Sequence, residues 1–102
     1  MVIVSVLYPL AGGKRFDLDY YMNTHIPLVE RLLIPAGLKQ TKVFQSAVTP
    51  GTEPEFGIIA ELFFDTAEEL HAALAAHGPE TQADIPNFTD ATPIIWLGRV
   101  LM

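Results

Sequence analysis

The side chain best suited to proton-transfer chemistry in this sequence is the imidazole of His25. It lies in the stretch 16–37 (FDLDYYMNTHIPLVERLLIPAG), where Tyr21, His25, Leu28 and Leu32 recur at helical spacing. Such a stripe must pack on an apolar surface, so the helix would bury a group whose ordinary pKa is near neutrality. His25 could then act as a general acid or base. A core histidine that donates to a backbone carbonyl would produce the same pattern.

A proline two residues after His25 predicts a deformed helix at this place. Pro27 has no N–H to donate to the carbonyl of Asn23, so we expect a kink or a bulge beside the histidine. The helix should begin at Asp17, which is a good N-cap residue. Asp19 in the first turn would interact favourably with the positive end of the helix dipole.

The composition excludes several other kinds of chemistry. There is no cysteine, so disulfides, thiolate metal sites and cysteine nucleophiles are ruled out. His71 and His77 would lie on different faces of a predicted second helix, so no metal site is expected. No glycine fingerprint offers a cradle for a nucleotide, so no cofactor is predicted. The net charge of −6 and the scattered basic residues argue against nucleic-acid binding.

Length and hydropathy predict one domain over residues 1–102. Half of the residues are hydrophobic, yet no apolar run is long enough to cross a bilayer, so no membrane partner is expected. No charged and apolar leader with a small-residue cleavage site begins the chain. We therefore expect a cytoplasmic protein.

The chain predicts six elements in the order β-α-β-β-α-β. Strands are expected over 2–8, 38–48, 56–64 and 94–102, with a hairpin loop over 49–54. The first helix should stop at 35–37. The second should begin after Thr66, which has capping-box spacing with Glu69, and end at Gly78 and Pro79. Residues 80–92 should be irregular, with one helical turn before Asp84. This order predicts an α+β, ferredoxin-like antiparallel sheet with both helices on one face.

The sheet should also have an apolar face that no helix covers. The residues expected there are Ile3, Leu7, Ile59, Phe63, Ile95, Leu97 and Leu101. Such a patch is larger than monomers usually expose, so we expect a second copy to cover it in a two-fold homodimer. Ser5, Glu61 and Arg99 are the polar exceptions, and we predict an interaction between Glu61 and Arg99.

Four segments resemble the EthD family, which belongs to the dimeric α+β barrel superfamily. They are Y-P at 8–9, F-D-x-D-Y-Y at 16–21, H-x-P-L-V at 25–29 and A-D-I-P-N-F-T-D at 83–90. The resemblance covers essentially the whole chain and implies a dimeric α+β barrel. Relatives of this barrel include muconolactone isomerases, polyketide cyclases and cofactor-free monooxygenases. It also implies a substrate pocket between the helices and the sheet of each subunit.

The predicted topology places one side of the sheet opposite His25. That side is expected to carry Val6, Tyr8, Leu62, Phe64, Ile94 and Trp96. We predict an apolar cleft there, in which His25 transfers a proton, Asp84 orients the imidazole or stabilises its cation, and Tyr8 or Tyr21 donates to a substrate oxygen. The expected substrate-binding residues are Tyr21, Phe64, Phe88 and Trp96. Alternatively, the aromatic side chains are only core and Asp84 only caps a turn.

Three functions are compatible with these features. The leading hypothesis is a small cofactor-free enzyme of isomerase, cyclase, lyase or oxygenase type that acts on a hydrophobic carbonyl or aromatic metabolite. The second is a non-catalytic accessory or metabolite-binding dimer of a catabolic pathway. The third is a dimer module without a pocket, in which His25 only packs. A cavity of a few hundred Å³ beside His25 would argue against the third.

Overall fold

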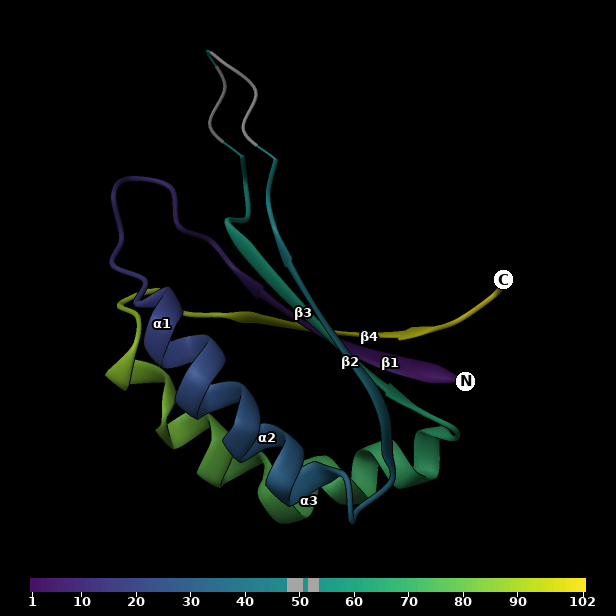
Figure 1. The fold of residues 1–102 in the computed structure, drawn as a ribbon. Coiled ribbons are helices and arrows are strands. Elements are labelled where there is room, and N and C mark those ends of the chain that lie inside the picture. Colours follow the sequence, from purple (N-terminus) through teal and green to yellow (C-terminus); the bar gives the residue numbers. More distant parts are fainter. Residues whose placement is uncertain (48–50, 52–53) are drawn as a thin grey trace.

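The computed structural model describes residues 1–47, 51 and 54–102, which form a four-stranded antiparallel sheet with the helices on one face (Figure 1). The elements are β1 (Val2–Tyr8), α1 (Leu18–Tyr20), η1 (Tyr21–His25), α2 (Ile26–Leu33), β2 (Leu38–Gln45), β3 (Ile58–Phe64), α3 (Ala67–Ala83), η2 (Ile85–Asn87) and β4 (Ile94–Arg99). The strand order is β2-β3-β1-β4, so the predicted ferredoxin-like fold is confirmed. The predicted hairpin loop lies outside the described residues except for Gly51 and Pro54.

The first helical stretch contains the predicted deformation. The side chain of Asp17 accepts a hydrogen bond from the backbone N–H of Tyr20, so the predicted N-cap is confirmed. The next turn, η1, is π-helical, and the N–H of Ile26 donates to the carbonyl of Tyr21, five residues earlier. Pro27 cannot donate a hydrogen bond, so the wider turn comes directly before it. His25 is the last residue of this turn.

The second helix is longer than predicted. It begins after Thr66, whose hydroxyl accepts from the N–H of Glu69, but it continues through Gly78 and Pro79 to Ala83. The hydroxyl of Thr81 donates to the carbonyls of His77 and Gly78 and provides a local partner near the proline. The single helical turn expected before Asp84 is instead η2, which follows it. The prediction that Gly78 and Pro79 end the helix is therefore wrong.

The register of β4 reverses the predicted assignment of its faces. Directly opposed residues in an antiparallel pair share a face, and Trp96 lies opposite Ser5 whereas Leu97 lies opposite Val4. Val4 is buried beneath the helices, so Leu97 is on the helix side and Trp96 on the outer side. The predicted faces of Ile94, Ile95, Trp96 and Leu97 are therefore wrong. Both parities of this strand are apolar, so its own sequence does not distinguish them.

The same register separates the two charges that were expected to interact. Glu61 pairs with Ser5 on the outer face, whereas Arg99 pairs with Val2 on the helix side. The side chain in register with Glu61 on the neighbouring strand is Lys42. The predicted interaction between Glu61 and Arg99 is therefore wrong.

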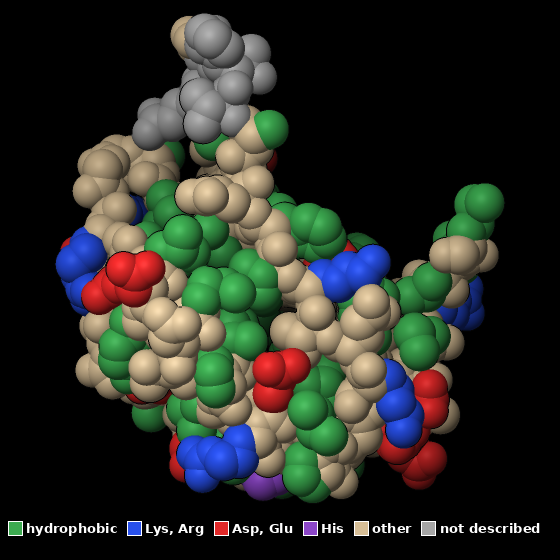
Figure 2. Space-filling model, in the orientation of Figure 1, with side chains coloured by type: hydrophobic (Ala, Val, Ile, Leu, Met, Phe, Trp, Pro, Cys, Tyr) green, Lys and Arg blue, Asp and Glu red, His purple; other side chains and the backbone are tan. Residues whose placement is uncertain are grey.

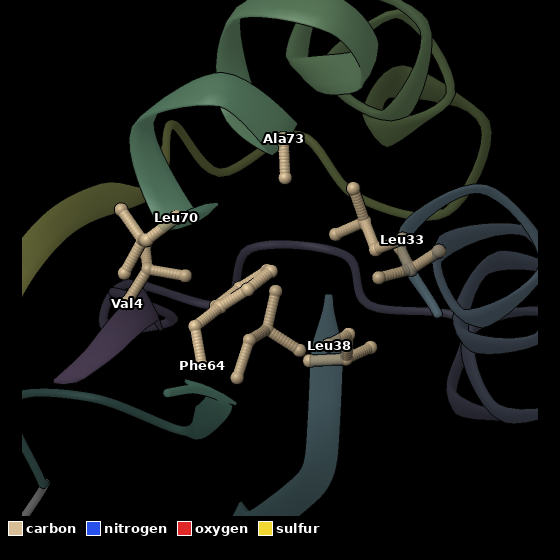
Figure 3. Close-up of a cluster of buried hydrophobic side chains, with 8 residues drawn as sticks. Val4, Leu33, Leu38, Phe64, Leu70 and Ala73 are labelled. Carbon is tan, nitrogen blue, oxygen red and sulfur yellow. The ribbon is translucent and has the colours of Figure 1, made fainter. Parts of the chain in front are cut away.

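One core cluster fills the space between α2, α3 and the sheet. Its members include Val4, Leu33, Leu38, Phe64, Leu70 and Ala73, which converge from different elements in Figure 3. A second buried cluster lies toward the other end of β1 and contains Tyr8, Tyr21, Ile26, Ile58 and Phe88. The candidate site belongs to this aromatic end.

The outer face of the sheet is apolar. Register places Ile3, Leu7, Phe44, Ile59, Phe63, Ile94 and Trp96 there. Trp96 is 57% exposed, and its ring lies so close to Gly98 that a Cβ at this glycine would meet it at 2.4 Å. The C-terminal segment projects from the body of the molecule and carries exposed hydrophobic side chains (Figure 2).

Within the described ranges, no helix combines the length and the apolar character needed to cross a membrane.

Candidate active site

His25 is buried within an aromatic cage at the end of η1. It is 5% exposed. The ring of Tyr21 stacks on the imidazole at 5.5 Å between centroids, and the ring of Phe88 is tilted against it at 4.6 Å. The π-helical turn delivers Tyr21 and His25 to the same side of the helix, four residues apart. These contacts restrain the imidazole, which is one requirement of a positioned acid or base.

The second part of the site is Asp84, which follows α3 and reaches the imidazole. His25 Nδ1 lies 2.9 Å from Asp84 Oδ2. The other carboxylate oxygen, Oδ1, accepts from the hydroxyl of Tyr20 at 2.7 Å and from the amide of Asn87 at 2.9 Å. The Asp84 side chain is only 14% exposed. Its carboxylate is therefore largely buried, and His25, Tyr20 and Asn87 are its hydrogen-bond partners.

The surroundings shift the pKa values of both partners downward. Burial lowers the pKa of His25, and the hydrogen bond and charge of Asp84 oppose this shift only in part. Burial alone would raise the pKa of Asp84, but the hydrogen bonds from Asn87, Tyr20 and His25 outweigh it and lower the pKa. At neutral pH the pair is therefore a neutral imidazole and a carboxylate.

The carboxylate also decides which imidazole nitrogen carries the proton. A carboxylate is only an acceptor, so a neutral His25 must hold its proton on Nδ1 and donate it to Asp84. Nε2 is then unprotonated and can accept a proton. The arrangement matches the aspartate–histidine half of a catalytic triad, in which the aspartate fixes the tautomer and stabilises the imidazolium.

An apolar cavity of about 110 Å³ adjoins the histidine. Its lining residues are Val4, Val6, Tyr8, His25, Val29, Leu33, Leu62, Leu74, Gly78, Thr81, Gln82, Ile85 and Ile95. The cavity is smaller than the few hundred Å³ that would argue against a dimer module without a pocket, and it suits a compact group rather than a large molecule. Burial raises the pKa of the Tyr8 hydroxyl far above its ordinary value, so this wall of the cavity keeps a protonated donor.

The structure separates the predicted site residues into three groups. His25 and Tyr8 line the cavity, and Asp84 is bonded behind the imidazole. Tyr21 and Phe88 pack around His25 without lining the cavity. Phe64 lies opposite Val2, at the far end of the sheet from Tyr8, and packs in the other core cluster. Trp96 lies on the outer face of the sheet because of the register of β4. The prediction that Phe64 and Trp96 line the cleft beside His25 is therefore wrong.

Several residues of the site are not predicted from the sequence. Tyr20 and Asn87 bind Asp84, although Tyr20 lies beside the apolar stripe and Asn87 stands in a segment predicted to be irregular. Gly78 and Gln82 line the cavity because α3 continues past the proline that was expected to end it. The position of Asn87 three residues after Asp84 was the available signal, since this spacing places two side chains together on a helical turn. No group of three or more metal-binding side chains occurs among the described residues.

Comparisons with known proteins agree with this fold. The EthD domain family matches residues 14–92. An EthD-like protein from Ralstonia eutropha JMP134 is 32% identical, with a TM-score of 0.88 over 99% of this chain and 92% of that chain. An EthD family protein from Bacillus halodurans C-125 is 25% identical, with a TM-score of 0.78 over 99% of each chain.

A more distant structure shares only the fold. SnoaB, a cofactor-independent oxygenase from Streptomyces nogalater, is 9% identical, with a TM-score of 0.67 over 99% of this chain and 92% of that chain. Among curated proteins, none matches this sequence.

Proposed function

The chain belongs to the EthD family, and on this basis we propose that it is a cofactor-free enzyme acting on a small hydrophobic carbonyl metabolite. In this proposal His25 is the acid and base that moves a proton at the carbon next to the carbonyl group. The observation that carries the proposal is the 2.9 Å contact of His25 Nδ1 with Asp84 Oδ2 at the wall of an apolar cavity.

The proposed step is enolisation. His25 Nε2 takes the proton from the α-carbon, the electrons of the C–H bond form a double bond between the α-carbon and the carbonyl carbon, and the π electrons of the carbonyl group move to its oxygen, which becomes the enolate oxygen. Tyr8, which stays protonated, donates a hydrogen bond to that oxygen. The imidazolium is stabilised by Asp84 and returns the proton to the same or to another carbon, as isomerases and cyclases require. A neutral imidazole with a depressed pKa is the correct starting state.

The test is hydrogen exchange, because enolisation in D₂O replaces the α-protons of a ketone by deuterium. We expect the wild-type protein to accelerate α-exchange in butyrophenone, followed by proton NMR. His25→Gln should lower the rate by about 10²–10⁴-fold, the usual contribution of a positioned general base. His71→Gln, on the exposed side of α3, is the matched control and should keep the wild-type rate.

Each outcome of this test has a distinct meaning. Equal exchange rates for wild type and His25→Gln would refute the proposed role of His25. Binding of the ketone without exchange would favour the alternative, a non-catalytic metabolite-binding protein.

A homodimer is also part of the proposal. The outer sheet face carries seven apolar side chains, and Trp96 and Phe44 are half exposed in the single chain. A second copy packed face to face would cover this surface. Two-fold symmetry would bury the same apolar patch on both subunits. The catalytic cavity lies on the opposite, helix-covered side of the sheet, so pairing would leave its lining in place.

A further inference from the structure

One wall of the cavity beside His25 is made by α3 and the turn after it. Gly78, Thr81, Gln82 and Ile85 line the cavity and are spaced by three, one and three residues. This is the spacing of a single helix face, and Tyr8 of β1 and His25 of η1 line the same cavity. The wall is therefore built from one short segment of sequence.

Gly78 leaves this wall without a side chain. It is buried in α3, and its backbone does not have the positive φ that would require glycine. Alanine has the higher helix propensity, but a Cβ on the residue before Pro79 would crowd the proline ring. Apart from its chain neighbours and the backbone of its own helix, a Cβ placed at Gly78 would meet no heavy atom within 4 Å, so the missing side chain leaves open space beside the cavity.

Gln82 supplies a polar group at the other end of the same wall. Gln82 is solvent-exposed, and its side-chain amide makes no hydrogen bond with another described residue. Thr81 is different, because its hydroxyl already donates to the carbonyls of His77 and Gly78. Gln82 therefore has a free N–H donor that can point to a ligand oxygen.

The cavity continues into a groove outside it. Gln82, Ile85 and Ile95 line both the cavity and a neighbouring space of about 320 Å³. The other residues of that groove are Pro86, Ala91, Thr92 and Pro93. The three shared residues mark the junction, and Gln82 is the polar one.

From these contacts we propose that Gly78 and Gln82 determine which ligand the site accepts, and that this ligand is an aryl or cyclic ketone with a chain beyond its carbonyl. The chain occupies the cavity where Gly78 leaves room, so that its α-carbon lies beside His25, and the carbonyl oxygen accepts from the Gln82 amide together with Tyr8. The ring lies in the outer groove. This inference rests on the proposed function and specifies its substrate class.

The test compares dissociation constants for two probes, butyrophenone and butylbenzene, measured by NMR titration. The second probe has the same carbon skeleton without the carbonyl oxygen. Gly78→Leu should weaken both probes at least tenfold, since its four side-chain carbons occupy the open space. Ala76→Leu, at an exposed position of the same helix, should stay within twofold of wild type. Gly78→Ala, which adds one methyl group, should fall between wild type and Gly78→Leu.

Gln82→Ala addresses the second half of the inference. It should weaken butyrophenone about threefold to tenfold, as the loss of one neutral hydrogen bond predicts, and leave butylbenzene unchanged. Equal losses for both probes, or wild-type affinity in Gly78→Leu, would overturn the inference.

Two results separate this inference from the proposed function. A wild-type protein that binds neither probe contradicts both. If the variants show the expected affinities but α-exchange does not depend on His25, the proposed function is contradicted. The roles of Gly78 and Gln82 in ligand selection are then upheld.

Discussion

Replacing Asp84 by asparagine should move the proton of His25 from one nitrogen to the other. The carboxylate accepts from Nδ1 through Oδ2, while Oδ1 accepts from Tyr20 and Asn87. An asparagine that keeps its carbonyl oxygen on Tyr20 and Asn87 must turn its NH₂ group toward His25. Nδ1 must then accept, so the proton moves to Nε2, which can no longer act as a base.

Two magnitudes follow from this geometry. In a serine-protease triad the equivalent change lowers kcat by about 10⁴, so we expect α-exchange to fall by roughly 10³–10⁴-fold. Three charge-assisted hydrogen bonds become neutral ones, each weaker by about 1 kcal/mol, while the lower desolvation cost of the amide offsets part of this loss. The expected loss of unfolding free energy is about 1–2 kcal/mol. For a domain of this size that lowers Tm by about 4–16 °C.

The assay for the tautomer needs no substrate. Long-range proton–nitrogen NMR correlations distinguish a protonated from an unprotonated ring nitrogen in ¹⁵N-labelled protein. Wild type should show His25 protonated on Nδ1 at pH 7.5, and Asp84→Asn should show it protonated on Nε2. Asp17→Asn, at the exposed N-cap, is the control and should leave the His25 signals unchanged. An Nδ1-protonated His25 in Asp84→Asn would refute the reasoning about the carboxylate.

Two further predictions concern stability and assembly. The pKa of His25 is lower in the folded than in the unfolded chain, so unfolding takes up protons in acid. Stability should be constant above about pH 6.5 and should fall below it by up to about 1.4 kcal/mol per pH unit. Urea titrations at pH 7.5 and 5.5 should show this loss in wild type and a much smaller one in His25→Gln. Sedimentation of wild type should give twice the chain mass of 11.2 kDa at micromolar concentration. Trp96→Glu should sediment as a monomer and keep its helical circular dichroism, whereas Arg31→Glu should stay dimeric. A monomeric wild type would contradict the proposed interface.

The sequence contained the information for the helices and strands because their signals are local. The apolar run of residues 2–8, the cap at Asp17 and the proline beside His25 each act within a few residues. The deformed turn at His25 was predictable for the same reason, since a proline removes a donor from its own helix. The continuation of α3 through Pro79 was not, because the packing of its buried residues Leu70, Ala73 and Gly78 overrides the local preference.

The site depended on contacts between distant parts of the chain. The candidate base and the order of the elements around it could be predicted from the amino-acid pattern, since His25 is the one histidine within the apolar helical stripe. Only the tertiary structure showed that Tyr20 and Asn87 hold Asp84 and that Trp96 faces away from the cavity. When the residues on both faces of a strand are apolar, as in β4, the strand's own sequence does not indicate which face packs against the helices. Its register is settled only when it pairs with β1, because a shift of one residue exchanges the two faces.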